Sequence, residues 1–552
     1  MNAEDSSGQP FSWLQRYPKL WLTIVSLIFL LPFADKAFHI DDPLFVWAGQ
    51  QMQSRWWDPF GFQVNWYGWA MPMHEVTKNP PLACAFLAIL ISLFGLNEFF
   101  LHAGFILQAV AAILGTYALA QRVCQNPVHV GLLTLFTPAF LVSSTTLMCD
   151  VLMAAFWVWS VAVWLEGLEK NNQLKLILAA FLMSGAALAK YFGIALIPLL
   201  LVFTIVKTRR LTWSLLYLLI PIVVMFLYEG AMRASYGHGM LLDAFRYAGE
   251  NEPRKVIAYF QKALIALAFA GGCCGTAFFL RRAVFRHGSR LILIVLGVVL
   301  LPATWSLSSS WSTGTVTHAG IAILWAFLAV SGIFALLLPV LEWNRARSVN
   351  AILFLFWIWG TFLFCILNWT INARSVLPMV PAVAILLIRR IESQSAIGLR
   401  RIHWPLAMGA TLSLVICLAD YRLANSARTA VAEIEDRFDE SPPSRIWFQG
   451  HWGFQFYAQT AGWRPYDLNN PVIRDGDMII LPFNNTNLKQ LSQATTERIA
   501  TIQIATFPFI ATMSRSVGAG FYMDFLGPLP FSFGSVPPEK YYVIKVKEPS
   551  SN

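Results

Sequence analysis

The sequence predicts a polytopic α-helical membrane protein that ends in a small α/β domain. The chain has 552 residues, of which 57% are hydrophobic and only 13% are charged, whereas a soluble domain carries about 25% charged residues. Its apolar residues recur in long runs, and a membrane crossing needs about 20 such residues. The final segment, 421–552, has no such run and instead alternates short β-type stretches with Gly, Pro, Asn and Asp.

The formal net charge of +10 does not predict nucleic-acid binding, because the basic residues stand in short clusters between apolar runs. Clusters of this kind are typical of cytoplasmic loops in membrane proteins. We therefore expect a multi-pass protein of the inner (plasma) membrane with membrane lipids and no nucleic acid as partners. The clusters that set the topology include Arg16 and Lys19, Lys207 with Arg209 and Arg210, and Arg389 with Arg390.

Taken in order, the chain divides into three parts. Residues 1–19 form a cytoplasmic N-terminus, residues 20–420 form the transmembrane domain, and residues 421–552 form the α/β domain. We expect roughly 13 spans, counting the segment 128–148 as one of them. The odd number puts the α/β domain on the extracytoplasmic side, together with the loop 35–100.

Two stretches of the transmembrane domain stand out. The loop 35–100 follows the first span and contains an apolar run, 82–94, that is short for a crossing, so we expect it to lie at the outer surface. The segment 174–206 has basic clusters at both ends, which predicts a hairpin with two short halves. Lys190 lies near the tip of this hairpin, where a cation requires a partner or water.

Acidic and basic residues gather on the predicted outer side. Asp41 and Asp42 are adjacent in the loop, Asp150 ends the segment 128–148, and Lys78 and Arg374 also lie near this face. Each position also has a structural interpretation: the three acids fit helix caps, Lys190 fits snorkelling or pairing with a buried acid, and Arg374 fits a surface anchor.

The sequence gives no diagnostic metal site. Its seven Cys are scattered without ligand spacing. His74, Glu75 and His318 are ligand types, but their spacing is not that of a known site. We therefore assign no metal ligand, while a divalent metal remains open as a cofactor.

Several of these features form one ordered set. The acidic pair follows the first span, a Pro-Pro-Leu helix ends in FGLNEFF, Asp150 follows, Lys190 stands in a short hairpin, and Arg374 precedes LPMVP. Over about residues 20–390 this order resembles the polyprenyl-phosphate-sugar-dependent glycosyltransferases of the GT-C fold. Relatives in that group are the protein O-mannosyltransferases and the aminoarabinose transferases. The run GHWGFQFYAQTAG resembles the tail of bacterial members.

The resemblance implies roles for six residues. Asp41 corresponds to the proposed catalytic base, Asp42 takes the place usually held by Glu, and Asp150 matches the second outer acid. Lys190 and Arg374 match cations near the donor phosphate. Lys78 corresponds to the Lys of the family's Lys-Pro-Pro run, but in this chain Asn79 stands between Lys78 and the two prolines. His102 stands where the family often has Arg.

The resemblance predicts an integral-membrane glycosyltransferase. It would move a monosaccharide from a polyprenyl-phosphate donor to an acceptor lipid, glycan or protein, with inversion at the anomeric carbon. A transporter or lipid flippase is the alternative, although no half-to-half repeat is evident; a non-catalytic scaffold is a third. The prediction requires Asp41 and Arg374 to meet in one pocket.

Overall fold

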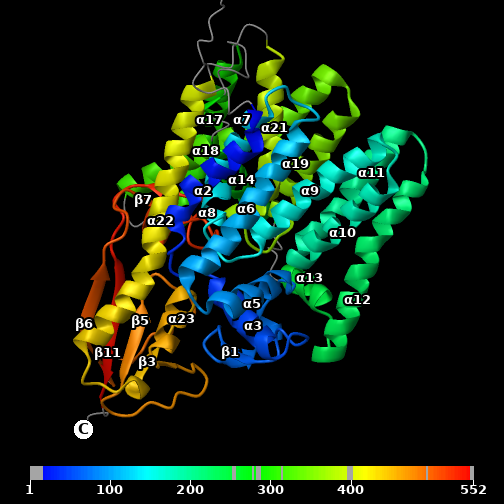
Figure 1. Cartoon of the computed structure of the whole chain (residues 1–552). Helices are drawn as coiled ribbons and strands as arrows, with labels where there is room; N and C mark the ends of the chain where they lie inside the picture. The colour runs from blue at the N-terminus through cyan, green and yellow to red at the C-terminus, as the bar shows by residue number, and fades with distance from the viewer. Residues whose placement is uncertain are drawn as a thin grey trace, which may run out of the picture.

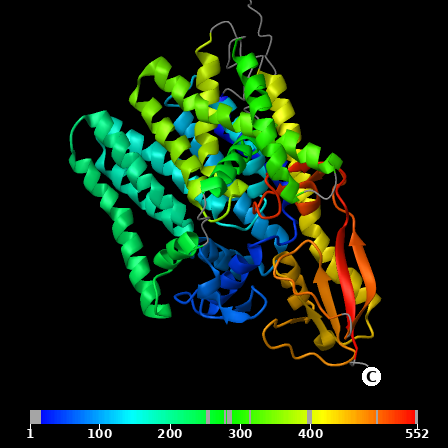
Figure 2. The same cartoon turned by 180° about the vertical axis from the view of Figure 1, so that it is seen from behind.

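A computed structural model describes residues 16–250, 256–275, 279–280, 288–311, 315–394, 402–492 and 495–547. A helical bundle forms the larger part, and a mixed sheet lies beside one end of it (Figure 1). The view from behind shows the same arrangement, with the N-terminal loop and the sheet at one end of the bundle (Figure 2). The predicted architecture, a polytopic helical protein with a small C-terminal α/β domain, is therefore confirmed. Residues 1–15 of the predicted N-terminus lie outside the described residues.

The helices of the bundle follow the apolar runs of the sequence. Their bounds are α2 (Pro18–Leu30), α6 (Glu98–Ala120), α7 (Pro127–Leu135), α8 (Pro138–Ser143), α9 (Asp150–Glu169), α10 (Gln173–Ala189), α11 (Leu196–Thr208), α12 (Leu219–Tyr236), α13 (Met240–Glu250), α14 (Val256–Cys273), α17 (Gly288–Ser308), α18 (Thr315–Ala346), α19 (Val349–Leu367), α20 (Ala373–Val376), α21 (Val380–Glu392) and α22 (His403–Arg437).

Within the described residues, seven helices are long and apolar enough to cross a membrane. Five more apolar helices have 10–17 residues, so the expected number of 13 spans stays a prediction. The predicted hairpin is present as α10 and α11, and Lys190 is the residue that ends α10. The seven spans are Glu98–Ala120, Asp150–Glu169, Tyr191–Thr208, Trp213–Tyr236, Thr317–Ala346, Val349–Leu367 and His403–Arg437.

The segment 128–148 differs from the single span that the sequence predicted. Pro138 begins a second short helix, so α7 and α8 are separated, and residues 144–149 are not helical. Ser143, Ser144, Thr145 and Thr146 form a polar run, and the last three bond their own side chains to nearby carbonyls. Such bonds compete with helix propagation. The result is a buried, irregular segment that ends at Asp150.

The loop after α2 folds into a compact unit. It contains α3 (Asp42–Ser54), a two-stranded hairpin of β1 (Gln63–Asn65) and β2 (Ala70–Pro72), α4 (Met73–Val76) and α5 (Leu82–Phe94). Helix α5 coincides with the predicted surface helix and packs on α3. Both helices lie at the end of the bundle that carries the sheet (Figure 1).

The C-terminal domain is a five-stranded sheet in the order β4-β3-β5-β11-β6. Strand β3 pairs in parallel with β4 and β5, whereas β11 pairs antiparallel with β5 and β6. Four of these strands coincide with the predicted β-type runs. After α22, the described part of this domain contains β3 (Ile446–Phe448), α23 (Gly453–Thr460), β4 (Arg464–Pro465), β5 (Met478–Pro482), β6 (Thr496–Ile504), β7 (Ile510–Ala511), β8 (Met513–Ser514), β9 (Ala519–Gly520), β10 (Ser532–Phe533) and β11 (Glu539–Val546).

The predicted boundary at residue 421 falls inside α22, which runs unbroken from His403 to Arg437. No Gly or Pro follows Gly409 within this helix, and the stretch is rich in Ala, Leu, Arg and Glu, which favour helix. The last membrane helix and the first helix of the C-terminal domain are therefore one element. This continuity fixes the sheet to the bundle.

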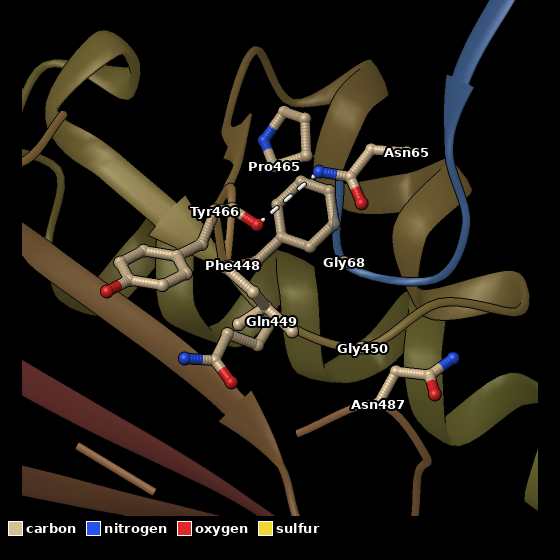
Figure 3. Close-up of a pocket in the computed structure, with 9 residues that line it drawn as sticks. Asn65, Gly68, Phe448, Gln449, Gly450, Pro465, Tyr466 and Asn487 are labelled. Carbon is tan, nitrogen blue, oxygen red and sulfur yellow. Dashed lines mark hydrogen bonds between the residues drawn. The ribbon is translucent and has the colours of Figure 1, made fainter. Parts of the chain in front are cut away.

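The loop and the C-terminal domain interlock. The backbone N–H groups of Ala37 and Phe38 donate to Asn425 Oδ1 and to Tyr457 Oη, both at 2.8 Å. A Cβ on Gly453 would lie 1.9 Å from the Phe38 carbonyl oxygen, so only glycine allows this approach. Farther along the loop, Asn65 Nδ2 donates to the Tyr466 carbonyl at 3.4 Å beside a small hollow (Figure 3).

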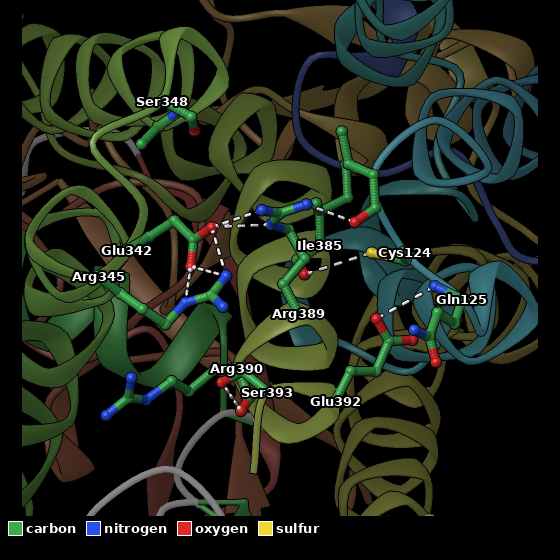
Figure 4. Close-up of polar contacts among 12 residues, drawn as sticks. Cys124, Gln125, Glu342, Arg345, Ser348, Ile385, Arg389, Arg390, Glu392 and Ser393 are labelled. Carbon is green, nitrogen blue, oxygen red and sulfur yellow. Dashed lines mark hydrogen bonds and ion pairs between the residues drawn. The ribbon is translucent and has the colours of Figure 1, made fainter. Parts of the chain in front are cut away.

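A cluster of ion pairs stabilises the other end of the bundle. Glu342 of α18 is buried and accepts bonds from Arg345 and from Arg389 of α21 (Figure 4). Glu392 of the same helix accepts from the backbone N–H of Asn126 at 2.8 Å. These contacts join α18, α21 and the start of α7, at the end away from α3 and α5.

Candidate active site

Four of the predicted site residues come together in one buried group, which we name the reaction cluster: Asp41, Asp150, Lys190 and Arg374. Arg374 Nη2 lies 3.2 Å from Asp41 Oδ2, and Arg374 Nη1 lies 3.7 Å from Asp150 Oδ2. Lys190 Nζ donates to Asp150 Oδ1. The expectation that Asp41 and Arg374 share one pocket is therefore met by the geometry.

Each member of the reaction cluster comes from a different element. Asp41 precedes α3, Asp150 begins α9, Lys190 ends α10 and Arg374 lies in α20. Breaks in helical structure fall beside all four positions, which lets the side chains of distant segments converge. Asp41 stands at the N-cap position of α3 but makes no capping bond with its side chain. Its carboxylate is directed to Arg374 instead.

The members of the reaction cluster differ in the exposed fraction of their side chains. The side chain of Asp41 is 30% exposed, whereas that of Asp150 is 1% exposed. Arg374 and Lys190 lie between, at 12% and 19%. Asp41 is thus the most exposed member of the cluster and Asp150 the most buried.

Two buried polar atoms of this cluster have no hydrogen-bond partner among the described residues: Arg374 Nε and Asp150 Oδ2. Arg374 Nη1 contacts the sulfur of Met148, which is a weak acceptor. Buried donors are ordinarily bonded, so an unpaired guanidinium N–H in a native protein calls for an explanation. Arg374 has donor capacity left for an anion.

Asp42 is placed differently from Asp41. Its side chain is fully buried, and its two oxygens accept the backbone N–H groups of His39 at 2.9 Å and Leu147 at 2.8 Å. Burial raises the pKa of Asp42 to about 7, opposed by these hydrogen bonds and by Lys36. Asp42 therefore fixes the loop against the segment before Asp150, while its catalytic role remains a prediction.

Lys78 does not join the reaction cluster. Its Nζ lies 2.5 Å from Asp243 Oδ2 of α13 and donates to the Glu75 carbonyl at 2.8 Å. The ring of Tyr247 lies 5.2 Å from the same ammonium group. The next residue, Asn79, accepts from Cys149 at 3.6 Å, which places the KNPP run near Asp150. Lys78 thus joins the loop to α13.

A second buried group lies nearby, which we name the support cluster: Lys36, His39, Asp420, Thr512 and Tyr522. Lys36 and Asp420 are both fully buried and lie 2.5 Å apart. Thr512 Oγ1 and Tyr522 Oη each donate to Asp420 at 2.8 Å. His39 Nε2 lies 3.9 Å from Asp420, and burial lowers the pKa of His39 to about 4.

Sequence reasoning missed the support cluster. Lys36 and Asp420 stand at the ends of apolar runs, and a charge at such a position is a weak signal for a buried pair. Tyr522 gave no signal, because nothing in the surrounding sequence indicates that its ring lies against Arg374, 5.6 Å from the guanidinium carbon. Only the tertiary structure brings the tail to this place.

In the described part of the chain, no group of three or more His, Cys, Asp or Glu side chains is placed to hold a metal ion. The ring of His74 stacks on Tyr236 at 4.7 Å. His318 bonds the Trp305 carbonyl through Nε2 at 2.8 Å. These two residues are thus engaged in separate contacts.

Comparison with known proteins identifies a related family over part of the chain. Residues 78–228 match the family model described as dolichyl-phosphate-mannose-protein mannosyltransferase. Over these residues the match confirms the resemblance that the sequence predicted. No curated protein matches the chain.

Several solved structures are similar to this chain over 82–86% of its length. An Archaeoglobus fulgidus oligosaccharyltransferase tethered to an acceptor peptide is 13% identical, with a TM-score of 0.48, 82% of this chain covered and 64% of that one. The Archaeoglobus fulgidus enzyme AglB in complex with an inhibitory peptide and a dolichol-phosphate is 14% identical, with a TM-score of 0.47 and coverages of 82% and 65%. ArnT from Cupriavidus metallidurans bound to undecaprenyl phosphate is 14% identical, with a TM-score of 0.44 and coverages of 86% and 94%. The chain thus spans just under two thirds of the length of the archaeal proteins.

Proposed function

We propose that this chain, a relative of the dolichyl-phosphate-mannose-protein mannosyltransferases over residues 78–228, is an integral-membrane glycosyltransferase that uses a polyprenyl-phosphate monosaccharide. The sugar passes to a hydroxyl or amine of an acceptor at the extracytoplasmic face of the inner membrane. The observation that carries the proposal is the reaction cluster. In it a partly exposed carboxylate, Asp41, pairs with Arg374, and the buried Asp150 lies against both Arg374 and Lys190.

Arg374 and Lys190 hold the donor phosphate. The unpaired Nε of Arg374 is a ready donor, and charge-assisted bonds to phosphate oxygens are about twice as strong as neutral ones. As the bond between the anomeric carbon and the phosphate oxygen breaks, negative charge grows on that oxygen. Fixed cations in a water-poor site stabilise this charge and contribute about 10²–10³-fold in rate.

Asp41 acts as the general base. It accepts the acceptor proton while the acceptor oxygen or nitrogen attacks the anomeric carbon, a contribution of about 10²–10⁴-fold. Asp41 Oδ2 is paired with Arg374 Nη2 at 3.2 Å. Arrival of a phosphate on Arg374 competes with that pair and frees Asp41, so the donor itself prepares the base. A single displacement of this kind inverts the anomeric centre.

Asp150 keeps the two cations together. It is buried and contacts both Lys190 and Arg374. A buried acid between two cations sets their spacing and offsets their mutual repulsion. In this proposal Asp150 orients the phosphate site and does not take the acceptor proton.

The experiment compares Asp41→Asn with Asp35→Asn. Asp35 is an exposed aspartate of the same loop, and its carboxylate accepts a bond from Tyr421 Oη at 3.0 Å. Envelope lipids and glycans are analysed by mass spectrometry in cells with wild type, either variant or no protein. We expect one glycosylated product in the wild type and in Asp35→Asn, and none with Asp41→Asn at equal protein level. If Asp41→Asn still formed the product, the general base would be another residue. If cells with the wild-type protein and cells without the protein gave the same products, the proposed transfer would be contradicted.

A further inference from the structure

The C-terminal domain holds the backbone segment that carries Arg374. The Ala373 N–H donates to the Phe521 carbonyl at 2.8 Å, and the Asp524 N–H donates to the Ile371 carbonyl at 3.0 Å. Asp524 Oδ1 also accepts from Thr370 Oγ1 at 2.6 Å and from the Ile371 N–H at 3.1 Å. Residues 521–524 thus pair with the chain on the N-terminal side of Arg374.

Between these contacts, the ring of Tyr522 lies against the guanidinium group. The Arg374 Cζ is 5.6 Å from the ring centroid, within the range of a cation–π contact. Tyr522 is 2% exposed, and its O–H donates to Asp420 of α22 at 2.8 Å. Burial raises the pKa of Tyr522 well above its ordinary value, which keeps this donor protonated.

The ring is itself fixed by the support cluster. Asp420 accepts from Tyr522, Thr512 and Lys36, and Lys36 also donates to Thr145 at 3.3 Å. Lys36 lies five residues before Asp41, and Thr145 lies five residues before Asp150. The support cluster therefore joins the loop, the irregular segment before α9, helix α22 and the tail around one carboxylate.

We propose that Tyr522 and Asp524 are positioning residues for Arg374, so that the C-terminal domain completes the anion site for a polyprenyl phosphate. This inference rests on the proposed function. With the Tyr522 ring on its face and the backbone before it paired, the Arg374 guanidinium group lies against Asp41 and Asp150. Its Nε has no hydrogen-bond partner among the described residues. A guanidinium held in advance binds phosphate at a lower cost in side-chain entropy than a mobile one.

The test measures binding of undecaprenyl phosphate to the purified full-length protein in detergent, so no knowledge of the sugar is needed. We expect Arg374→Ala to weaken binding about a hundredfold, the scale of a lost charged hydrogen bond. Tyr522→Leu should weaken it about tenfold. Tyr522→Phe retains the aromatic face, so its affinity should stay within about threefold of wild type.

A double variant separates positioning from general destabilisation. If Tyr522 acts through Arg374, then Arg374→Ala with Tyr522→Leu binds no more weakly than Arg374→Ala alone, because coupled residues are not additive. Tyr541→Leu is the matched control: Tyr541 is a buried tail tyrosine whose hydroxyl lies 3.3 Å from Ser426 Oγ of α22, and we expect no loss of affinity.

Thr370→Val provides an independent test if Tyr522→Leu does not fold. It removes one donor to Asp524 with little change in shape, and we expect about threefold weaker binding that again vanishes on an Arg374→Ala background. Additive losses in the double variants, or an equal loss in Tyr541→Leu, would overturn the positioning role while leaving the proposed function intact. Unchanged binding by Arg374→Ala would instead refute the phosphate site itself, and the positioning role with it.

Discussion

The reaction cluster and the support cluster are both buried ion pairs at the same end of the bundle, yet they are built differently. In the support cluster Asp420 and Lys36 are both fully buried, and Asp420 accepts three donors, while the Nε2 of His39, 3.9 Å from Asp420, has no hydrogen-bond partner among the described residues. In the reaction cluster one acid is partly exposed, and two polar atoms have no partner within the described residues. A buried carboxylate that accepts three donors contributes rigidity, whereas a partly exposed cluster with an unpaired guanidinium N–H retains capacity for a ligand.

Asp41 and Asp42 show the same contrast between a residue with exposed surface and one with fully bonded oxygens. Asp41 and Asp42 are adjacent, but Asp42 bonds two backbone N–H groups and Asp41 meets a side-chain cation. The capping and catalytic interpretations of this acidic pair are thus divided between the two residues. We expect changes in saturated groups to act on stability and changes in the reaction cluster to act on transfer.

The largest expected effect is on stability. Lys36→Met leaves the Asp420 charge buried without its cation, which should lower the free energy of unfolding by about 3–5 kcal/mol. The midpoint of thermal unfolding in detergent measures the loss, and Lys19→Met, at an exposed position, is the control. Combining Lys36→Met with Asp420→Asn removes both charges and should recover part of the stability. A Lys36→Met variant as stable as the control would show that the two clusters do not differ as proposed.

Next comes Lys190→Met in the reaction cluster. Removal of one cation from the phosphate site should lower transfer about a hundredfold. Stability should change less than in Lys36→Met, because Arg374 remains 3.7 Å from Asp150. Product yield and unfolding midpoint are measured on the same preparations, with Lys170→Met, an exposed lysine of the α9 end, as control. If Lys190→Met lost much stability but transferred sugar normally, Lys190 would act as a structural residue, contrary to the proposed difference between the two clusters.

The smallest expected effect concerns pH. Burial lowers the pKa of His39 to about 4 from 6.5, while Asp420 raises it and Lys36 and Arg374 lower it further. Between these two pKa values the unfolded chain binds the proton and the folded chain does not, so stability falls as pH decreases from 6.5 to 4. As the pH decreases from 6.5 to 4, wild type should therefore lose up to about 3 kcal/mol of unfolding free energy relative to His39→Gln, which has no imidazole to titrate. Parallel pH profiles of the two proteins would show that His39 does not titrate in this way.

The sequence by itself determined the class of the molecule. Apolar runs fixed the helical bundle, because a membrane-embedded backbone must satisfy its hydrogen bonds within helices. Short β-type stretches separated by Gly, Pro, Asn and Asp predicted four strands of the C-terminal sheet. Charged residues at the ends of apolar runs indicated Asp150, Lys190 and Arg374, since a charge next to a membrane span is costly without a partner.

Only the tertiary structure decided which of these groups meet and what each one does. Asp150 pairs with Lys190 over 40 positions of sequence, and Arg374 meets Asp41 over 333; no local pattern encodes such separations. Pro138 and the polar run after it broke a predicted span, and α22 continued through a predicted boundary. Tyr522 lies against Arg374 because its hydroxyl bonds Asp420 of α22 and its neighbours Phe521 and Asp524 pair with the backbone before Arg374. Local propensity sets where helices and strands form, but the close contacts of a buried polar site depend on packing between segments distant in the chain.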